Sequence, residues 1–100
     1  MAGILDIMEI VPAGEERTLI ASSSDVRTSY ISITNKSGST ASVNIYKEFN
    51  GLKLNRYMED LQLYDKASFL EDKPVVMKDN TLFKVSSDQD VEVIIEGEYL

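Results

Sequence analysis

The side chains in this sequence that are most capable of chemistry are carboxylates. Among the acidic residues that stand side by side or two apart are Glu59-Asp60, Glu71-Asp72, and Asp88 with Asp90. Two carboxylates can act as acid and base when burial separates their pKa values. Neighbours on a strand point to opposite faces, so only Asp88 and Asp90 can share a site, for example one for calcium. Because the glycine and the distal glutamate of a calcium loop are missing, a solvated turn is the favoured interpretation.

A serine nucleophile is the second chemical possibility. Ser22, Ser23 and Ser24 precede Asp25, but the chain has no histidine to act as a base and no cysteine. A flexible polar loop therefore explains this segment better than a catalytic triad. The glycines are too scattered to form a phosphate-binding loop: Gly14, Gly38, Gly51 and Gly97. We expect no enzyme activity, no catalytic residue, no metal and no cofactor.

The tyrosines are the remaining candidates for binding. There are five of them, Tyr30, Tyr46, Tyr57, Tyr64 and Tyr99, and there is no tryptophan. Exposed tyrosines are common at protein interfaces and in carbohydrate platforms. Tyrosines on a solvated sheet also pack against each other across strands and stiffen it. The sequence leaves both interpretations open.

The charge of the chain excludes several classes of partner. The net charge is −7, with −2 carried by residues 1–50 and −5 by residues 51–100. An acidic chain without a basic stripe repels nucleic acid and anionic lipid, so we expect neither as a partner. The first residues, MAGILDIMEIVPAGEE, lack a basic leader, and no apolar run approaches the roughly 20 residues that span a bilayer. We expect synthesis in a cytoplasm.

Alternation with a period of two dominates the elements that would carry these side chains. Residues 28–34 and 43–49 alternate around the turn-forming segment NKSGST, which predicts a β-hairpin. Its register follows from matching apolar side chains: Ile33 with Val43, and Ile31 with Ile45. That register places Tyr30 opposite Tyr46 on the outward face.

The C-terminal part of the chain repeats this pattern. Residues 81–85 and 91–96 alternate around the loop SSDQD and predict a second hairpin, with Val85 opposite Val91. The last segment, VEVIIEGEYL, is apolar on both faces through Ile94, so it is either central in a sheet or paired with another chain. Two hairpins with one polar face each indicate two sheets whose apolar faces meet.

The other segments predict shorter strands: 3–11, 17–22, 67–71 and 74–78. Pro74 favours the start or the edge of a strand. Residues 52–64 fit either a helix or a strand, and the β-rich surroundings favour a strand. We therefore predict an all-β fold, a single β-sandwich domain of about seven or eight short antiparallel strands, immunoglobulin-like or jelly-roll-like, with a small barrel as the alternative. Residues 1–12 form an N-terminal arm or the first strand.

Three segments together resemble small β-sandwich virion structural proteins of tailed bacteriophages. They are the strand–turn–strand segment 28–46, the segment KPVVMKDNTL at 73–82 and the closing segment VEVIIEGE at 91–98. Such proteins often have Gly-Asp where this chain has Asp79-Asn80, so the second segment departs from the pattern. The resemblance implies a non-enzymatic building block of the head decoration (cement), neck, tail accessory or fibre-associated type.

From this resemblance we predict a capsid decoration protein that binds and stabilises the assembled head lattice and resides in the virion. Its partner would be the major capsid protein or another virion structural protein, and its copies would form a homo-oligomer or sit on a lattice. The alternative is a neck, tail or fibre module that recognises a host glycan through Tyr30 and Tyr46. The predicted partner-binding residues are Ile4, Leu5, Ile7, Met8, Ile10, Tyr30, Tyr46 and Tyr99.

Overall fold

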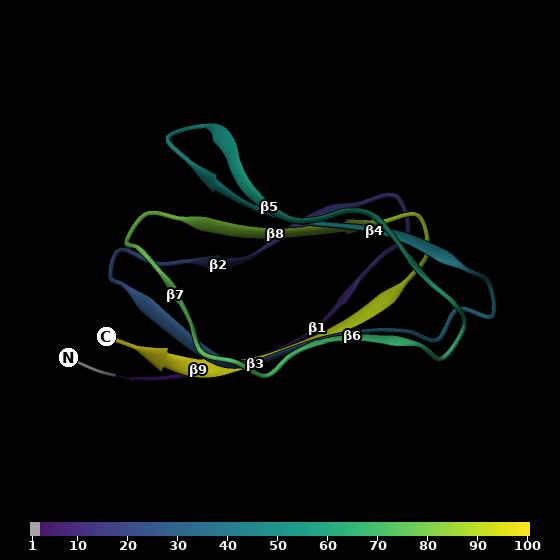
Figure 1. Cartoon of the computed structure of the whole chain (residues 1–100), viewed down its shortest axis with the longest axis horizontal. Helices are drawn as coiled ribbons and strands as arrows, with labels where there is room; N and C mark the ends of the chain where they lie inside the picture. The colour runs from purple at the N-terminus through teal and green to yellow at the C-terminus, as the bar shows by residue number, and fades with distance from the viewer. Residues whose placement is uncertain (1–2) are drawn as a thin grey trace.

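The computed structural model describes residues 3–100, together with their side chains except those of residues 54–58. This part of the chain forms nine strands in two layers (Figure 1). The strands are β1 (Gly3–Val11), β2 (Glu16–Ala21), β3 (Val26–Asn35), β4 (Ala41–Phe49), β5 (Leu52–Leu63), β6 (Ser68–Glu71), β7 (Val75–Met77), β8 (Leu82–Ser87) and β9 (Val91–Tyr99). The predicted all-β sandwich is confirmed, with one strand more than the upper estimate.

The strand order identifies the type of sandwich. Sheet I has the order β1-β9-β3-β6, with the short β7 also pairing with β3, and sheet II has the order β2-β8-β4-β5. All the pairs are antiparallel. Strands β1 and β2, β3 and β4, β5 and β6, and β8 and β9 follow each other in the chain but lie in opposite sheets. This arrangement is a jelly roll. It is not immunoglobulin-like, since that fold keeps its first two strands in one sheet.

Both predicted hairpins are wrong. Strands β3 and β4 belong to different sheets, and so do β8 and β9. Side chains that meet across a core alternate along the chain in the same way as side chains that share one sheet face, so the period of two fits either arrangement. As a result, Tyr30 lies opposite Glu96, Tyr46 lies opposite Lys84, and the predicted Tyr30–Tyr46 pair does not exist.

The predicted burial is nevertheless correct, because the inner faces of the two sheets form the core. The central side chains of β3 and β4 are fully buried: Ile31, Ile33, Val43 and Ile45. The same holds in β8 and β9 for Phe83, Val85, Val91, Val93 and Ile95. Burial of each such side chain stabilises the fold by about 1.5–3 kcal/mol. The apolar alternation therefore determines the core even though it does not determine the pairing.

The remaining predicted strands are confirmed. Residues 52–63 are a strand, and a turn at Asn50 and Gly51 leads into it with φ angles of 53° and 78°. Positive φ at both positions is typical of a type I′ hairpin turn. Strand β9 lies between β1 and β3, so the closing segment is central in its sheet, as one of the two predicted arrangements requires. Pro74 directly precedes the edge strand β7.

Two polar or small residues fix the geometry around the core. Asn35 is fully buried and its side-chain amide donates to the carbonyl oxygens of Ser39 (2.6 Å) and Leu63 (2.9 Å), which holds the β3–β4 connection to the end of β5. Gly97 faces a shift in the β3–β9 register. A Cβ atom at Gly97 would lie 2.8 Å from the Cα of Thr28 and would overlap the carbonyl of Arg27, so only glycine fits there.

Candidate functional site

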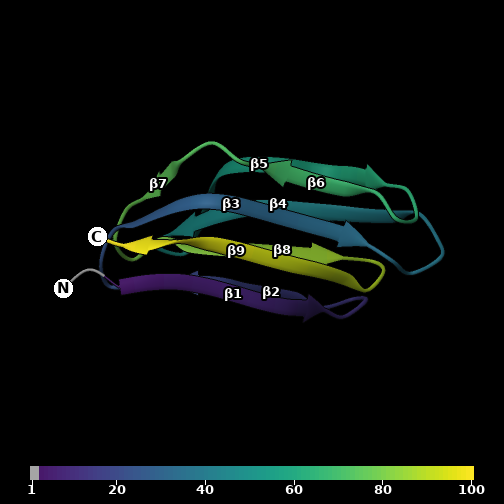
Figure 2. The same cartoon turned by 90° about the horizontal axis from the view of Figure 1, so that it is seen from below.

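The outer face of sheet I is the surface turned away from the core. Figure 2 shows this sheet from its outer side, with β1 at one edge and β6 and β7 at the other. The register places side chains in rows across the strands: Ile4–Glu98–Arg27–Val76, Asp6–Glu96–Tyr30, Met8–Ile94–Ser32–Leu70 and Ile10–Glu92–Thr34–Ser68. We refer to these residues together as the sheet I face.

The sheet I face exposes large apolar side chains. Each of the following is more than half exposed: Ile4 (86%), Met8 (77%), Ile10 (58%), Leu70 (59%) and Val76 (51%). Three of them lie on β1, where the strand has a neighbour on one side only. Met8, Ile10 and Ile94 are among the residues that line an open hollow of ≈ 490 Å³. Clustered apolar exposure of this kind is typical of interaction surfaces.

The charges of the sheet I face are unevenly balanced. Glu98 forms an ion pair with Arg27, and Glu92 forms one with Lys36 at 3.3 Å. Asp6 and Glu96 face each other on β1 and β9, and neither has an ion-pair partner among the described residues. Like charges directly opposite each other on neighbouring strands are destabilising. The second row of the face is therefore negative, and on β1 its Asp6 lies between the exposed apolar side chains of Ile4 and Met8.

The outer face of sheet II is different, because its charges satisfy one another. The ammonium group of Lys84 lies 3.1 Å from Glu48 and 3.7 Å from Glu16. Lys53 lies 3.7 Å from Glu16 and 4.5 Å from the centre of the Tyr46 ring, and the Tyr46 hydroxyl donates to Glu16. This network spans all four strands of the sheet and leaves Tyr46 only 5% exposed. Among the described side chains, these residues form a connected polar network.

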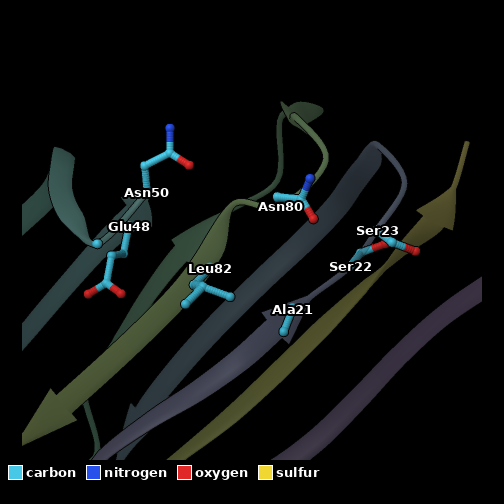
Figure 3. A pocket seen from close by; sticks show the side chains of 8 residues that line it. Ala21, Ser22, Ser23, Glu48, Asn50, Asn80 and Leu82 are labelled. Atoms are coloured by element: carbon cyan, nitrogen blue, oxygen red, sulfur yellow. The ribbon is translucent and has the colours of Figure 1, made fainter.

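A polar pocket of ≈ 360 Å³ opens at one end of the sandwich (Figure 3). It is lined by Ala21, Ser22, Ser23, Glu48, Asn50, Gly51, Asn80 and Leu82. In Figure 3 the two asparagines approach the pocket from separate turns, while the serines lie on the β2–β3 connection. The backbone N–H of Asn80 is bound by the Ser22 carbonyl, and the Glu48 carboxylate is bound by Lys84. No aromatic ring is among the residues that line it, so a stacking platform for a sugar is missing from the described part of the pocket.

The loop carboxylates Asp88 and Asp90 and the serine Ser22 have structural partners. Asp88 accepts a hydrogen bond from the backbone N–H of Ser42, and Asp90 accepts one from that of Ala13, each at 2.8 Å. Each carboxylate therefore fastens its loop to a different segment. The Ser22 hydroxyl accepts from the N–H of Ser24 at 3.1 Å. Within residues 3–100, excluding the side chains of 54–58, no three potential metal ligands cluster.

The predicted partner-binding residues separate into three groups. Ile4, Met8 and Ile10 lie together on the sheet I face, and the half-buried Tyr30 joins them beside Glu96. Ile7 and Tyr99 are half-buried and pack against the core. Leu5 (2% exposed) and Tyr46 (5%) are buried, so their prediction as surface contacts is wrong. Leu5 points inward by the strand alternation, and Tyr46 is covered by the Lys53 side chain.

Sequence reasoning missed several members of the sheet I face: Asp6, Ile94, Glu96, Leu70 and Val76. The alternation in residues 91–96 separated Glu92, Ile94 and Glu96 from the apolar face, but no pattern showed that β1 and β9 are neighbours. Leu70 and Val76 join the face because β6 and β7 both pair with β3. Only the topology brings them to the same surface.

Comparison with known proteins gives little further information. No protein-family profile matches the sequence, and no curated protein matches it either. A solved structure described as "Structure of infectious bursal disease virus Gt strain" is similar with a TM-score of 0.40 and 10% sequence identity. The match covers 98% of this chain and 32% of that chain, so this chain spans about a third of its length. The described residues contain no helix long and apolar enough to cross a membrane.

Proposed function

We propose that this protein is a non-enzymatic virion structural protein that attaches to a larger assembly through the sheet I face. The observation that carries the proposal is the group of apolar side chains on that face, with Met8 77% exposed at its edge strand. A monomer gains nothing from exposing such residues to water, whereas an attached protein gains free energy by burying them. The more specific role that we propose is a capsid decoration protein of a tailed bacteriophage.

Decoration requires rigidity and many weak contacts rather than a reaction. The fully buried core of the jelly roll supplies a stiff body, with the sheet I face on one side and the charged network on the other. Each copy needs only modest affinity if it bridges neighbouring capsid subunits, since contacts on a repeating lattice act together. Jelly rolls occur in viral capsid domains but also in lectins and cupins, so the fold permits this role without assigning it.

The glycan-binding alternative has lost its main support. It requires an exposed pair of tyrosines, but Tyr46 is buried under Lys53 and bonded to Glu16. A neck or tail accessory role uses the same adhesive face as decoration. The position of the protein in the particle is therefore what an experiment must decide.

The proposal is tested by cosedimentation of the purified chain with virions of the virus whose genome encodes it. Wild type is expected to pellet in a fixed ratio to the major capsid protein, and Met8→Lys is expected to remain in the supernatant. Thr40→Lys adds the same charge at an exposed position before β4 and outside the sheet I face, and should pellet as wild type does. Wild-type protein that stays in the supernatant, or that is absent from purified virions, rules the proposal out. Binding to isolated tails but not to heads rules out the decoration role.

A further inference from the structure

The free edge of β1 differs from the other three sheet edges. Proteins protect edge strands by shortness, proline, bulges or charge. At the other edge of sheet I, β6 has four residues and β7 has three and follows Pro74. In sheet II, the register of β2 shifts between Thr18 and Ile20, and that of β5 shifts twice against β4. Among the described strands, only β1 is an edge strand that pairs over nine residues without a shift.

The edge of β1 is also close to the two carboxylates of the sheet I face that have no ion-pair partner among the described residues. Asp6 lies on β1 with Ile4 and Met8 on either side of it on the same face, and Glu96 faces it from β9. The acids of the first and fourth rows of the sheet I face already have ion-pair partners: Glu98 pairs with Arg27, and Glu92 pairs with Lys36. A cation arriving at this edge would relieve the repulsion between two carboxylates. The apolar neighbours would lower the local dielectric and strengthen that attraction.

We propose that β1 accepts an extended segment of a partner protein as an added strand, with a Lys or Arg of that segment beside Asp6 and Glu96. This proposal rests on the proposed function and specifies the chemistry of the partner. The added strand would continue sheet I by main-chain hydrogen bonds, with apolar side chains next to Ile4, Met8 and Ile10. Its recognisable pattern is a cation at one outward position and small apolar residues at the neighbouring outward positions.

A second copy of this chain is a poorer occupant of the same edge. Residues 3–11 contain Asp6 and Glu9 but no lysine or arginine. Pairing β1 with the β1 of another copy would therefore add two acids to the seam and supply no cation to Asp6. The net charge of −7 on each copy opposes that association further. Charge complementarity thus favours a basic segment from a different protein.

The test is a titration of the ¹⁵N-labelled full chain, followed by NMR, with the peptide acetyl-Thr-Val-Thr-Val-Thr-Lys-Thr-Val-Thr-amide. Saturable shifts are expected in the amides of β1 and β9, with the far edge at β6 unchanged. In the double variant Asp6→Asn/Glu96→Gln, binding should weaken by about two- to fivefold. The control Glu71→Gln/Asp72→Asn removes the same charge at the opposite end of sheet I and should bind as wild type does.

Four outcomes would overturn the inference. They are absence of shifts at β1, equal binding of a peptide with Glu in place of Lys, equal weakening in the control variant, and a β1-mediated dimer of the chain alone in analytical ultracentrifugation. The last result would assign the edge to a second copy. Failure here is distinguishable from failure of the proposed function, because cosedimentation with virions does not depend on the peptide. If the chain pellets with virions but does not bind the peptide, only the proposal of an added strand at β1 fails, and the proposed function stands.

Discussion

The buried amide of Asn35 offers a sharp test of how the two sheets are held together. Asn35 is 0% exposed, and its amide nitrogen donates to the carbonyls of Ser39 and Leu63, while its oxygen accepts from the N–H of Ser37 at 3.0 Å. The substitution Asn35→Asp keeps the shape of the side chain and the acceptor. It removes both donated bonds and brings a carboxylate against two carbonyl oxygens.

The expected loss of stability follows from these partners. The carbonyl of the buried Leu63 loses its side-chain donor at a cost of about 1–3 kcal/mol, and the exposed Ser39 can turn to water at a smaller cost. Burial of the carboxylate adds a further penalty. We expect a total of roughly 3–4 kcal/mol at neutral pH, which lowers the melting temperature by roughly 12–30 °C for a domain of this size.

The pH dependence has a definite sign. Burial raises the pKa of the new carboxyl in the folded state above its unfolded value of about 3.9. The penalty is therefore smallest below about pH 3, where both states are protonated, and it grows as the pH rises from the unfolded pKa to the folded pKa. The assay is thermal and urea unfolding followed by circular dichroism, with wild type and variant compared at each pH.

The control is Asn44→Asp on the outer face of sheet II, where the asparagine oxygen accepts from the N–H of Asp60 at 3.0 Å. A carboxylate preserves that bond, so we expect a change below about 1 kcal/mol. If Asn35→Asp cost no more than Asn44→Asp, the role assigned to the buried amide would be refuted. A penalty that shrinks with rising pH would refute the argument about its charge.

Three further substitutions test separate parts of the structure. Gly97→Ala should lower the free energy of unfolding in urea by about 2–4 kcal/mol, because the added methyl group overlaps the β3 backbone. The control Gly3→Ala, whose Cβ would lie 3.7 Å from Tyr99, should be nearly neutral. Equal effects of the two substitutions would contradict the close approach of Gly97 to β3. Asp6→Asn/Glu96→Gln removes a like-charge pair, so the melting temperature should stay unchanged or rise by up to roughly 8 °C. A clear fall in the melting temperature would show that these acids stabilise the fold. Lys84→Met should lower the free energy of unfolding by about 1–2 kcal/mol, because Glu16 and Glu48 lose the cation that they share. This loss should shrink at high salt. No change in stability at any salt concentration would mean that the network on sheet II does not stabilise the fold.

The sequence was sufficient to predict burial but not connectivity. The alternation in 28–34 and 43–49 correctly placed Ile31 and Ile45 inside. A period of two reports only which face of each strand is turned away from water. Whether two such strands share a sheet or face each other across the core depends on how the connection between them bends. That bend involves long-range contacts, such as the bonds from Asn35 to Leu63, which no local pattern contains.

The candidate site was predictable to the same extent. Ile4, Met8 and Ile10 were predicted as partner-binding residues and do lie on one outward face, but Leu5 and Ile7 were grouped with them although they face the core. Tyr46 also points outward, as predicted, but it is buried because Lys53 from β5 covers its ring. The like-charge pair of Asp6 and Glu96 arises from residues at opposite ends of the chain, and only the pairing of β1 with β9 brings them together.

The central claim is that the sheet I face attaches this protein to a larger particle. The most direct measurement is a cryo-electron microscopy map of the virion at a resolution that separates the two sheets. The structure predicts ordered copies on the capsid shell, with β1 and β9 turned toward the capsid protein and Lys84 turned toward solvent. Copies attached through sheet II with Met8 left in solvent, or no copies at all, would contradict it.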